Sequence, residues 1–215
     1  MIQIEHTKVE GWEAALRGMR NPMNSWDRAD TTFDRDGYFP CGMGDNDHTL
    51  AQKLADAGQV HGKYLRMINV TCDITAPMYW WQEFDTYKVG TVRNSCSKMH
   101  KLLSKKFDTG DFSHDKIAWS DTGMEVFTNL IHYLNELRAD FLNESDPKNK
   151  KRIWYQILQF LPASYNQRST VQMNYAVLKN IYQYRKDHKL DEWREFCYWI
   201  HYLPYSELIT GGNHE

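Results

Sequence analysis

The sequence predicts an α+β protein in which helices predominate. Apolar residues recur at helical spacing along most of the chain, while one segment alternates in the manner of a strand. No internal repeat or low-complexity tract interrupts this pattern. A chain of 215 residues is long enough to bury a sizeable core. We therefore expect a single domain that spans residues 1–215.

Helices are predicted wherever apolar residues recur every three or four positions. In the first of them, Trp12, Leu16 and Met19 lie on one side. Pro77 and Pro147 support two others, because the fixed backbone angle of proline suits the start of a helix. The expected helices span residues 10–20, 49–61, 78–87, 92–105, 123–143, 147–160, 170–185 and 190–203.

The best strand candidate is the segment 64–75, in which Ile68, Val70 and Ile74 fall on one face. Residues 21–47 are rich in Asn, Asp, Gly and Pro, which predicts a long loop. Such a loop either closes over a pocket or covers an interface.

Composition excludes several classes of function. The formal net charge is −2, which argues against a broad nucleic-acid-binding surface. The four cysteines stand singly, so neither a zinc cluster nor a disulfide framework is expected. No apolar run approaches membrane-spanning length, and no signal pattern begins the chain. We expect a cytoplasmic protein without metal, membrane or nucleic-acid partners.

The most informative stretch runs from Leu161 to Asp187 and holds Arg168 and Arg185 among polar amides. Guanidinium groups bind planar anions, such as a nucleotide phosphate, through paired hydrogen bonds. On one continuous helix the two arginines would lie roughly 25 Å apart and could not hold one small anion. Either Arg168 lies in a loop ahead of the helix, with Ser169-Thr170 as its N-cap, or the site is shared between subunits.

This stretch resembles the C-terminal signature of the flavin-dependent thymidylate synthases. In that family a Leu-Pro leads into an arginine, an asparagine on the next helix, and a second arginine followed by x-Asp. Leu161-Pro162, Arg168, Asn174 and Arg185-x-Asp187 match this signature without a gap.

A second resemblance to the family covers residues 66–98. In the family a strand leads into a small residue, a proline and an aromatic-rich turn, which Ala76-Pro77-Met78-Tyr79 matches. Gln82-Glu83 then stands at the family's Arg-Gln pair, and Thr86-Tyr87-Lys88 stands at its Arg-His-Arg. Without a gap, Cys96 falls on the family's second serine and Lys98 on its final arginine.

A register shifted by one residue places Ser97 on the second serine instead, so Cys96 and Ser97 are both candidates. A thiolate at Cys96, beside Lys98 and His100, could attack C6 of a pyrimidine, because neighbouring cations lower the pKa of a thiol. The alternative is a small buried thiol that replaces serine.

The resemblance implies helices packed on a small mixed or antiparallel sheet, in a homo-oligomer that is a tetramer in the family. It implies FAD as cofactor, NADPH and methylenetetrahydrofolate as co-substrates, and a deoxypyrimidine monophosphate, dUMP, that receives one carbon at C5. The implied substrate contacts are Glu83, Lys98, Arg168 and Arg185. The implied cofactor contacts are Thr86, Tyr87, Lys88, Asn174 and Asn180. The implied catalytic residues are Arg185 and either Cys96 or Ser97.

Two departures from the family leave other functions open. Thr86-Tyr87-Lys88 has lost the two arginines of the family motif, and Glu83 replaces a glutamine near the base. A carboxylate only accepts hydrogen bonds, which favours cytosine because its exocyclic amine is a donor. The alternatives are a phage-encoded enzyme that makes a modified pyrimidine, such as a 5-hydroxymethyl nucleotide or one derived from dCMP, and a non-catalytic nucleotide-binding protein of the same fold.

Overall fold

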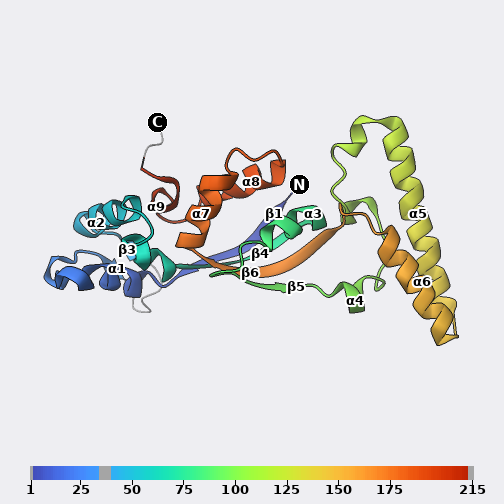
Figure 1. Cartoon of the computed structure of the whole chain (residues 1–215), viewed down its shortest axis with the longest axis horizontal. Coiled ribbons are helices and arrows are strands. Elements are labelled where there is room, and N and C mark those ends of the chain that lie inside the picture. Colours follow the sequence, from blue (N-terminus) through green and yellow to red (C-terminus); the bar gives the residue numbers. More distant parts are fainter. Residues whose placement is uncertain (1, 34–39, 213–215) are drawn as a thin grey trace. The chain divides into compact units, whose positions relative to one another are not determined.

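Helices pack on a four-stranded sheet whose strand order is β1-β4-β6-β5, which confirms the α+β class (Figure 1). The computed structural model describes residues 2–33 and 40–212. Within this part the chain forms two compact units. Unit 1 comprises residues 75–84 and 95–169, and unit 2 comprises residues 2–74, 85–94 and 170–212. The single domain over residues 1–215 stays a prediction.

The four strands of the main sheet are β1 (Gln3–Glu10), β4 (Asn69–Pro77), β5 (Val92–Ser95) and β6 (Asn166–Asn174), and a separate ribbon pairs β2 (Thr32–Phe33) with β3 (Pro40–Gly42). The α-helices are α1 (Trp12–Arg20), α2 (Asp45–Asp56), α3 (Met78–Phe84), α4 (Lys98–Lys101), α5 (Asp121–Asn143), α6 (Pro147–Phe160), α7 (Tyr175–Arg185), α8 (Asp191–Ile200) and α9 (Glu207–Thr210). Short 3-10 helices are η1 (Asn21–Met23), η2 (Trp26–Arg28), η3 (Gly62–Arg66), η4 (Thr109–Asp111) and η5 (Ile117–Trp119).

Five predicted helices are confirmed as α1, α3, α5, α6 and α8. In the two longest helices, a capping residue next to the first turn fixes the N-terminus. Ser120 caps α5 by accepting a hydrogen bond from the backbone N–H of Gly123, and Asp146 caps α6 by accepting from Lys148 and Asn149. Among the described residues, no helix combines the length and the apolar character needed to cross a membrane.

The predicted helix 170–185 is wrong in its first part, because residues up to Asn174 belong to strand β6. Alternate residues of β6 are buried, as one face of a sheet requires. The strand pairs antiparallel with β4: the Tyr175 N–H donates to Ile68 O at one end, and the Met78 N–H donates to Tyr165 O at the other. Arg168 therefore lies within a strand rather than in a loop, and the proposed Ser169-Thr170 cap is wrong.

Other boundaries differ as well. The predicted helix 92–105 is replaced by strand β5 and the short helix α4, and the strand predicted from Tyr64 begins at Asn69. The helix predicted over 49–61 begins at Asp45 and ends at Asp56. Of the predicted loop 21–47, residues 34–39 lie outside the described residues. The remainder holds η1, η2, the β2–β3 ribbon and the first residues of α2.

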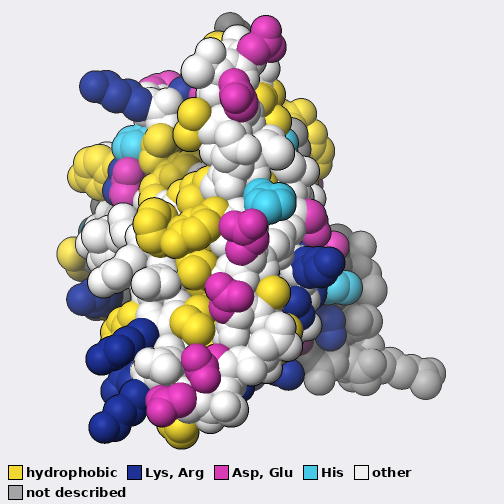
Figure 2. Space-filling model, turned by 90° about the vertical axis from the view of Figure 1, so that its right-hand side faces the viewer, with side chains coloured by type: hydrophobic (Ala, Val, Ile, Leu, Met, Phe, Trp, Pro, Cys, Tyr) yellow, Lys and Arg dark blue, Asp and Glu magenta, His cyan; other side chains and the backbone are white. Residues whose placement is uncertain are grey.

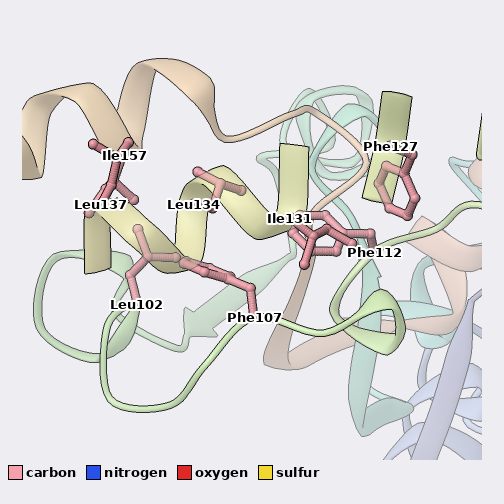
Figure 3. Packing of buried hydrophobic residues seen from close by; sticks show 8 residues of the cluster. All are labelled: Leu102, Phe107, Phe112, Phe127, Ile131, Leu134, Leu137 and Ile157. Carbon is pink, nitrogen blue, oxygen red and sulfur yellow. The ribbon is translucent and has the colours of Figure 1, made fainter. Parts of the chain in front are cut away.

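The core of unit 1 forms where α5 and α6 pack against the segment that follows α4 (Figure 3). Leu134 and Ile157 are fully buried there. The labelled cluster comprises Leu102, Phe107, Phe112, Phe127, Ile131, Leu134, Leu137 and Ile157. On the outer side of these helices, hydrophobic side chains gather beside a row of acidic side chains (Figure 2). Val126, Tyr133 and Phe160 are among the exposed hydrophobic residues of α5 and α6.

In unit 2 a buried ion pair joins α1 to α2. Nε of Arg20 lies 2.6 Å from a carboxylate oxygen of Asp47, and both side chains are buried. Asp47 also accepts the backbone N–H groups of Asp30 and Thr31, while the carboxylate of Asp30 accepts those of Asn46 and Asp47. This reciprocal arrangement holds the start of α2 against the segment before β2, because buried charges are stable only when paired and hydrogen-bonded.

Candidate functional site

A cavity of about 570 Å³ lies in unit 2 between α7, the end of α2 and the turn after α3. We call it the α7 cavity. Its size is typical of small-molecule sites. Thr86, Tyr87, Lys88, Asn174 and Asn180, which are the five residues expected to contact the cofactor, all line it.

Helix α7 contributes one continuous face to this cavity. Ala176, Asn180 and Gln183 are spaced by four and three residues, so they project from the same side of the helix. Asn174 precedes them as the N-cap, and its Oδ1 accepts the backbone N–H of Val177 at 3.0 Å. The predicted helix 170–185 would place Asn174 inside a helix, whereas its role as N-cap of α7 fixes it at the cavity wall.

Gly90 brings the turn after α3 against this cap. Its φ of +77° lies in the left-handed region. A Cβ atom at Gly90 would stand 2.9 Å from Nδ2 of Asn174 and 3.0 Å from a methyl carbon of Val177. Only glycine allows the turn that carries Thr86, Tyr87 and Lys88 to approach α7 so closely.

The charged lining of the α7 cavity is basic. Arg66, Lys88 and Lys179 line it, and no carboxylate does among the described residues. Nζ of Lys179 donates to Ala55 O at 3.0 Å, and burial lowers the pKa of this ammonium group. Such a lining favours an anionic ligand.

Arg185 stands at the end of α7 and contacts a lining residue of the cavity. Its Nε donates to the hydroxyl of Tyr87 at 2.8 Å, and its Nη1 lies 2.8 Å from Nε2 of His188. The guanidinium carbon lies 4.8 Å from the ring centre of Trp193. Hydrogen bonds and ring contacts together restrict this side chain to one orientation.

A second cavity, of about 350 Å³, lies in unit 1 around α4, and we call it the α4 cavity. Cys96, Ser97, Lys98 and Arg168, four of the expected substrate and catalytic residues, line it. The α4 cavity is also basic: Lys101 and Lys105 join Lys98 and Arg168, and the carboxylate in the lining is that of Asp111.

Backbone pairing between β6 and the segment after β5 places these residues together. The Cys96 N–H donates to Arg168 O at 2.9 Å, and the side-chain amide of Gln167 donates to Cys96 O at 2.7 Å. Gln167 is buried and Arg168 is exposed, as neighbours in a strand point to opposite faces. Cys96 and Ser97 both line the cavity, so the geometry accommodates either register of the sequence match.

The sequence interpretation missed Lys101, Lys105 and Tyr165. Lys105 forms an ion pair with Asp111 at 2.7 Å, and this hydrogen bond raises the pKa of Lys105. Burial raises the pKa of Tyr165, whose phenol can donate a hydrogen bond to a ligand in the cavity. The spacing of Lys98 and Lys101 was the available signal, because residues three apart share a helix face, whereas Lys105 lies beyond the end of α4.

Two predicted residues line neither cavity in the described chain. Glu83 lies half-buried on α3 in unit 1, and Arg185 reaches the α7 cavity only through Tyr87. Among the described residues, no cluster of His, Cys, Asp and Glu side chains is placed to hold a metal ion.

Comparison with solved structures identifies the fold as that of the flavin-dependent thymidylate synthases. Thymidylate synthase X (ThyX) from Helicobacter pylori, solved with FAD and dUMP, aligns over 98% of this chain and 97% of its own with a TM-score of 0.68 and 15% identity. A second structure of that enzyme with the same ligands aligns over 97% of this chain and 96% of its own, with a TM-score of 0.64 and 17% identity.

The UMP/dUMP methylase PolB from Streptomyces cacaoi, bound to 5-Br dUMP, aligns over 98% of this chain and 95% of its own, with a TM-score of 0.61 and 14% identity. No protein-family model matches the sequence, and neither does any curated protein. The likeness therefore concerns the fold alone.

Proposed function

We propose that this protein is a flavin-dependent thymidylate synthase-like enzyme that transfers one carbon from methylenetetrahydrofolate to C5 of dUMP. The α7 cavity is the observation that carries the proposal. Three segments that are far apart in the sequence supply its lining, and two of them hold all the residues expected at the cofactor: Thr86, Tyr87, Lys88, Asn174 and Asn180.

The lining of the α7 cavity suits FAD. The amides of Asn174, Asn180 and Gln183 both donate and accept hydrogen bonds, as the edge of a flavin ring requires. Lys88 and Arg66 supply cations for a diphosphate. When bound, FAD supplies the redox chemistry of the reaction, with NADPH as its reductant.

In the α4 cavity, Lys98 and Arg168 bind the phosphate of the nucleotide, and Cys96 or Ser97 lies beside the base. Ammonium and guanidinium groups both suit a phosphate dianion, and the guanidinium adds paired hydrogen bonds. Arg185, which the resemblance implies at the pyrimidine ring, lies in unit 2, where Tyr87 holds its guanidinium in place. The convergence of Arg168 and Arg185 on one nucleotide remains a prediction.

FAD binding is tested by the visible absorbance spectrum of the purified protein with and without added FAD. For the wild-type protein we expect the yellow spectrum of bound flavin. Asn180→Ala should weaken FAD binding about tenfold, because it removes a buried hydrogen bond to the cofactor. The control is Gln172→Ala, an exposed amide of β6 that does not line the cavity. A wild-type protein that stays colourless with excess FAD would refute the flavin-dependent function.

Nucleotide binding is tested by calorimetric titration with dUMP and dCMP. Lys98→Gln and Arg168→Gln should each weaken binding about tenfold. Lys106→Gln, an exposed lysine outside the α4 cavity, should leave binding unchanged. Mass spectrometry of the product then separates a methylated from a hydroxymethylated pyrimidine. Binding without turnover under any folate or reductant would indicate a nucleotide-binding protein instead.

We also propose that the protein is a homo-oligomer, a tetramer by its resemblance to the family. The exposed hydrophobic side chains on the outer side of α5 and α6 support a contact between copies, because monomers rarely leave such patches uncovered (Figure 2). Tyr133→Lys should then lower the mass measured by light scattering. A mass equal to that of the monomer in the wild-type protein would contradict this proposal.

A further inference from the structure

A third cavity, of about 1000 Å³, lies in unit 2 and shares no lining residue with the α7 cavity. We call it the α1 cavity. Its walls come from α1, η1, η2, α2 and η3. Its volume lies at the upper end of the range for small-molecule sites, so a simple inorganic ion would occupy only a small part of it.

Basic side chains surround this cavity. Arg17, Arg28 and Lys63 line it from three different elements, and Asp27 is the acidic residue of the lining. Within the described chain, none of the three cations forms an ion pair. Their positive charge is therefore directed to the solvent and to whatever enters the cavity.

Arg20 adds a buried donor to the same lining. Its side chain is 3% exposed, its Nε contacts Asp47 at 2.6 Å, and its Nη1 donates to Ser25 O at 3.2 Å. Its Nη2 is buried and makes no hydrogen bond to any residue that the structure describes. Leaving a buried donor unsatisfied is unfavourable, and a ligand oxygen that reached Nη2 would offset this cost. Because Asp47 balances the charge of Arg20, this donor adds direction rather than net charge.

The remainder of the lining is apolar and open to solvent. Met23, Val60 and Met67 are 83%, 71% and 42% exposed, respectively, and all three line this cavity. Leu50 and Leu54 of α2 continue the apolar wall. A group of exposed aliphatic side chains beside cations provides contacts for a ligand that has both an apolar body and a negative charge.

We propose that the α1 cavity is a binding site for an organic anion, with an apolar body that carries a phosphate, sulfonate or carboxylate group. The anionic group contacts Arg28 and Lys63, and the body covers Met23, Val60 and Met67. A neutral apolar compound would leave the cations unused, and a small anion would leave the apolar wall exposed. This site is independent of the proposed thymidylate synthase function.

The test uses 8-anilinonaphthalene-1-sulfonate, an apolar aromatic sulfonate, in a titration of the full-length protein followed by fluorescence and calorimetry. The neutral comparison is N-phenyl-1-naphthylamine, which has the same rings without the sulfonate. The test variant is Arg28→Gln combined with Lys63→Gln, both at exposed positions. The matched control is Lys53→Gln, an exposed lysine of α2 that does not line the cavity. Thermal unfolding of each variant verifies that it is folded.

We expect saturable binding of the sulfonate, at least about tenfold tighter than that of the neutral compound. The double variant should weaken sulfonate binding about tenfold and leave binding of the neutral compound unchanged, and Lys53→Gln should alter neither. Three results would each overturn the proposal: no saturable binding, equal affinity for the two compounds, or unchanged sulfonate affinity in the double variant.

Discussion

The guanidinium of Arg185 is held by the phenol of Tyr87. Its Nε donates to the tyrosine hydroxyl at 2.8 Å, and its carbon lies 5.6 Å from the centre of that ring. Tyr87 also lines the α7 cavity, so one side chain joins the candidate cofactor site to the arginine that we expect to act on the pyrimidine. The histidine that the family places here is replaced by a residue with a defined structural role.

Tyr87→Phe should therefore reduce turnover of dUMP about tenfold, because it removes a hydrogen bond to a charged group and leaves Arg185 free to reorient. The ring remains, so contacts with Trp193 and the cavity wall persist. Steady-state kinetics with dUMP measures the effect. The matched control is Tyr184→Phe, an exposed tyrosine beside Arg185 on α7, which should turn over dUMP at the wild-type rate. Equal rates in the two variants would show that Tyr87 does not position Arg185.

Gly90→Ala should destabilise the protein and abolish FAD binding. The alanine pays about 1–3 kcal/mol for a left-handed conformation, and its Cβ displaces the Asn174 cap, which is worth about 1 kcal/mol. Gly211→Ala separates the two effects, since Gly211 has a φ of +89° with nothing within 4 Å of the added Cβ and does not line the α7 cavity. Urea unfolding and flavin titration of both variants make the comparison. Retained FAD affinity in Gly90→Ala would contradict the role of this turn.

The free energy of unfolding should depend on pH in the acid range because of Asp47. Burial raises the pKa of this carboxyl, but hydrogen bonds from Thr31 and Arg20 outweigh it, so the folded-state pKa lies below the ordinary value of 3.8. The stabilisation is fully present above pH 3.8 and is lost as the pH falls through the lower folded-state pKa.

Asp47→Asn should cost about 3–5 kcal/mol at neutral pH, because Arg20 keeps its buried charge without a partner. The variant should also show a weaker decline of the free energy of unfolding in acid. Urea unfolding as a function of pH measures both. Asp27→Asn, at an exposed carboxylate, serves as the control and should follow the wild-type curve.

Cys96 should react with iodoacetamide much faster than Cys72 and Cys197. Cys96 is exposed, whereas burial raises the pKa of both Cys72 and Cys197 to about 12. Peptide mass spectrometry of a Cys41→Ser variant at pH 8 compares the three thiols. Saturating dUMP should protect Cys96 if the α4 cavity holds the nucleotide. Labelling of Cys72 at the rate of Cys96 would contradict the burial of Cys72.

Local sequence was sufficient to predict the helices whose capping residues mark their N-termini. Ser120 and Asp146-Pro147 mark the starts of α5 and α6, and an amphipathic pattern follows each. The match of Leu161 to Asp187 with the family signature likewise uses neighbouring residues, and it identified the fold that comparison with solved structures confirms. Signals of this kind lie within one continuous stretch of the chain.

Strands β5 and β6 could not be predicted in the same way, because strand pairing depends on distant partners. The pattern of residues 170–185 predicts a helix, but bonds to β4 and to Cys96 make residues 166–174 a strand. That pairing places Arg168 beside Cys96 and brings Lys101 and Lys105 to the α4 cavity. It also makes Asn174 a helix cap at the wall of the α7 cavity. The residue types were evident in the chain, whereas their grouping into cavities arose from contacts between remote segments.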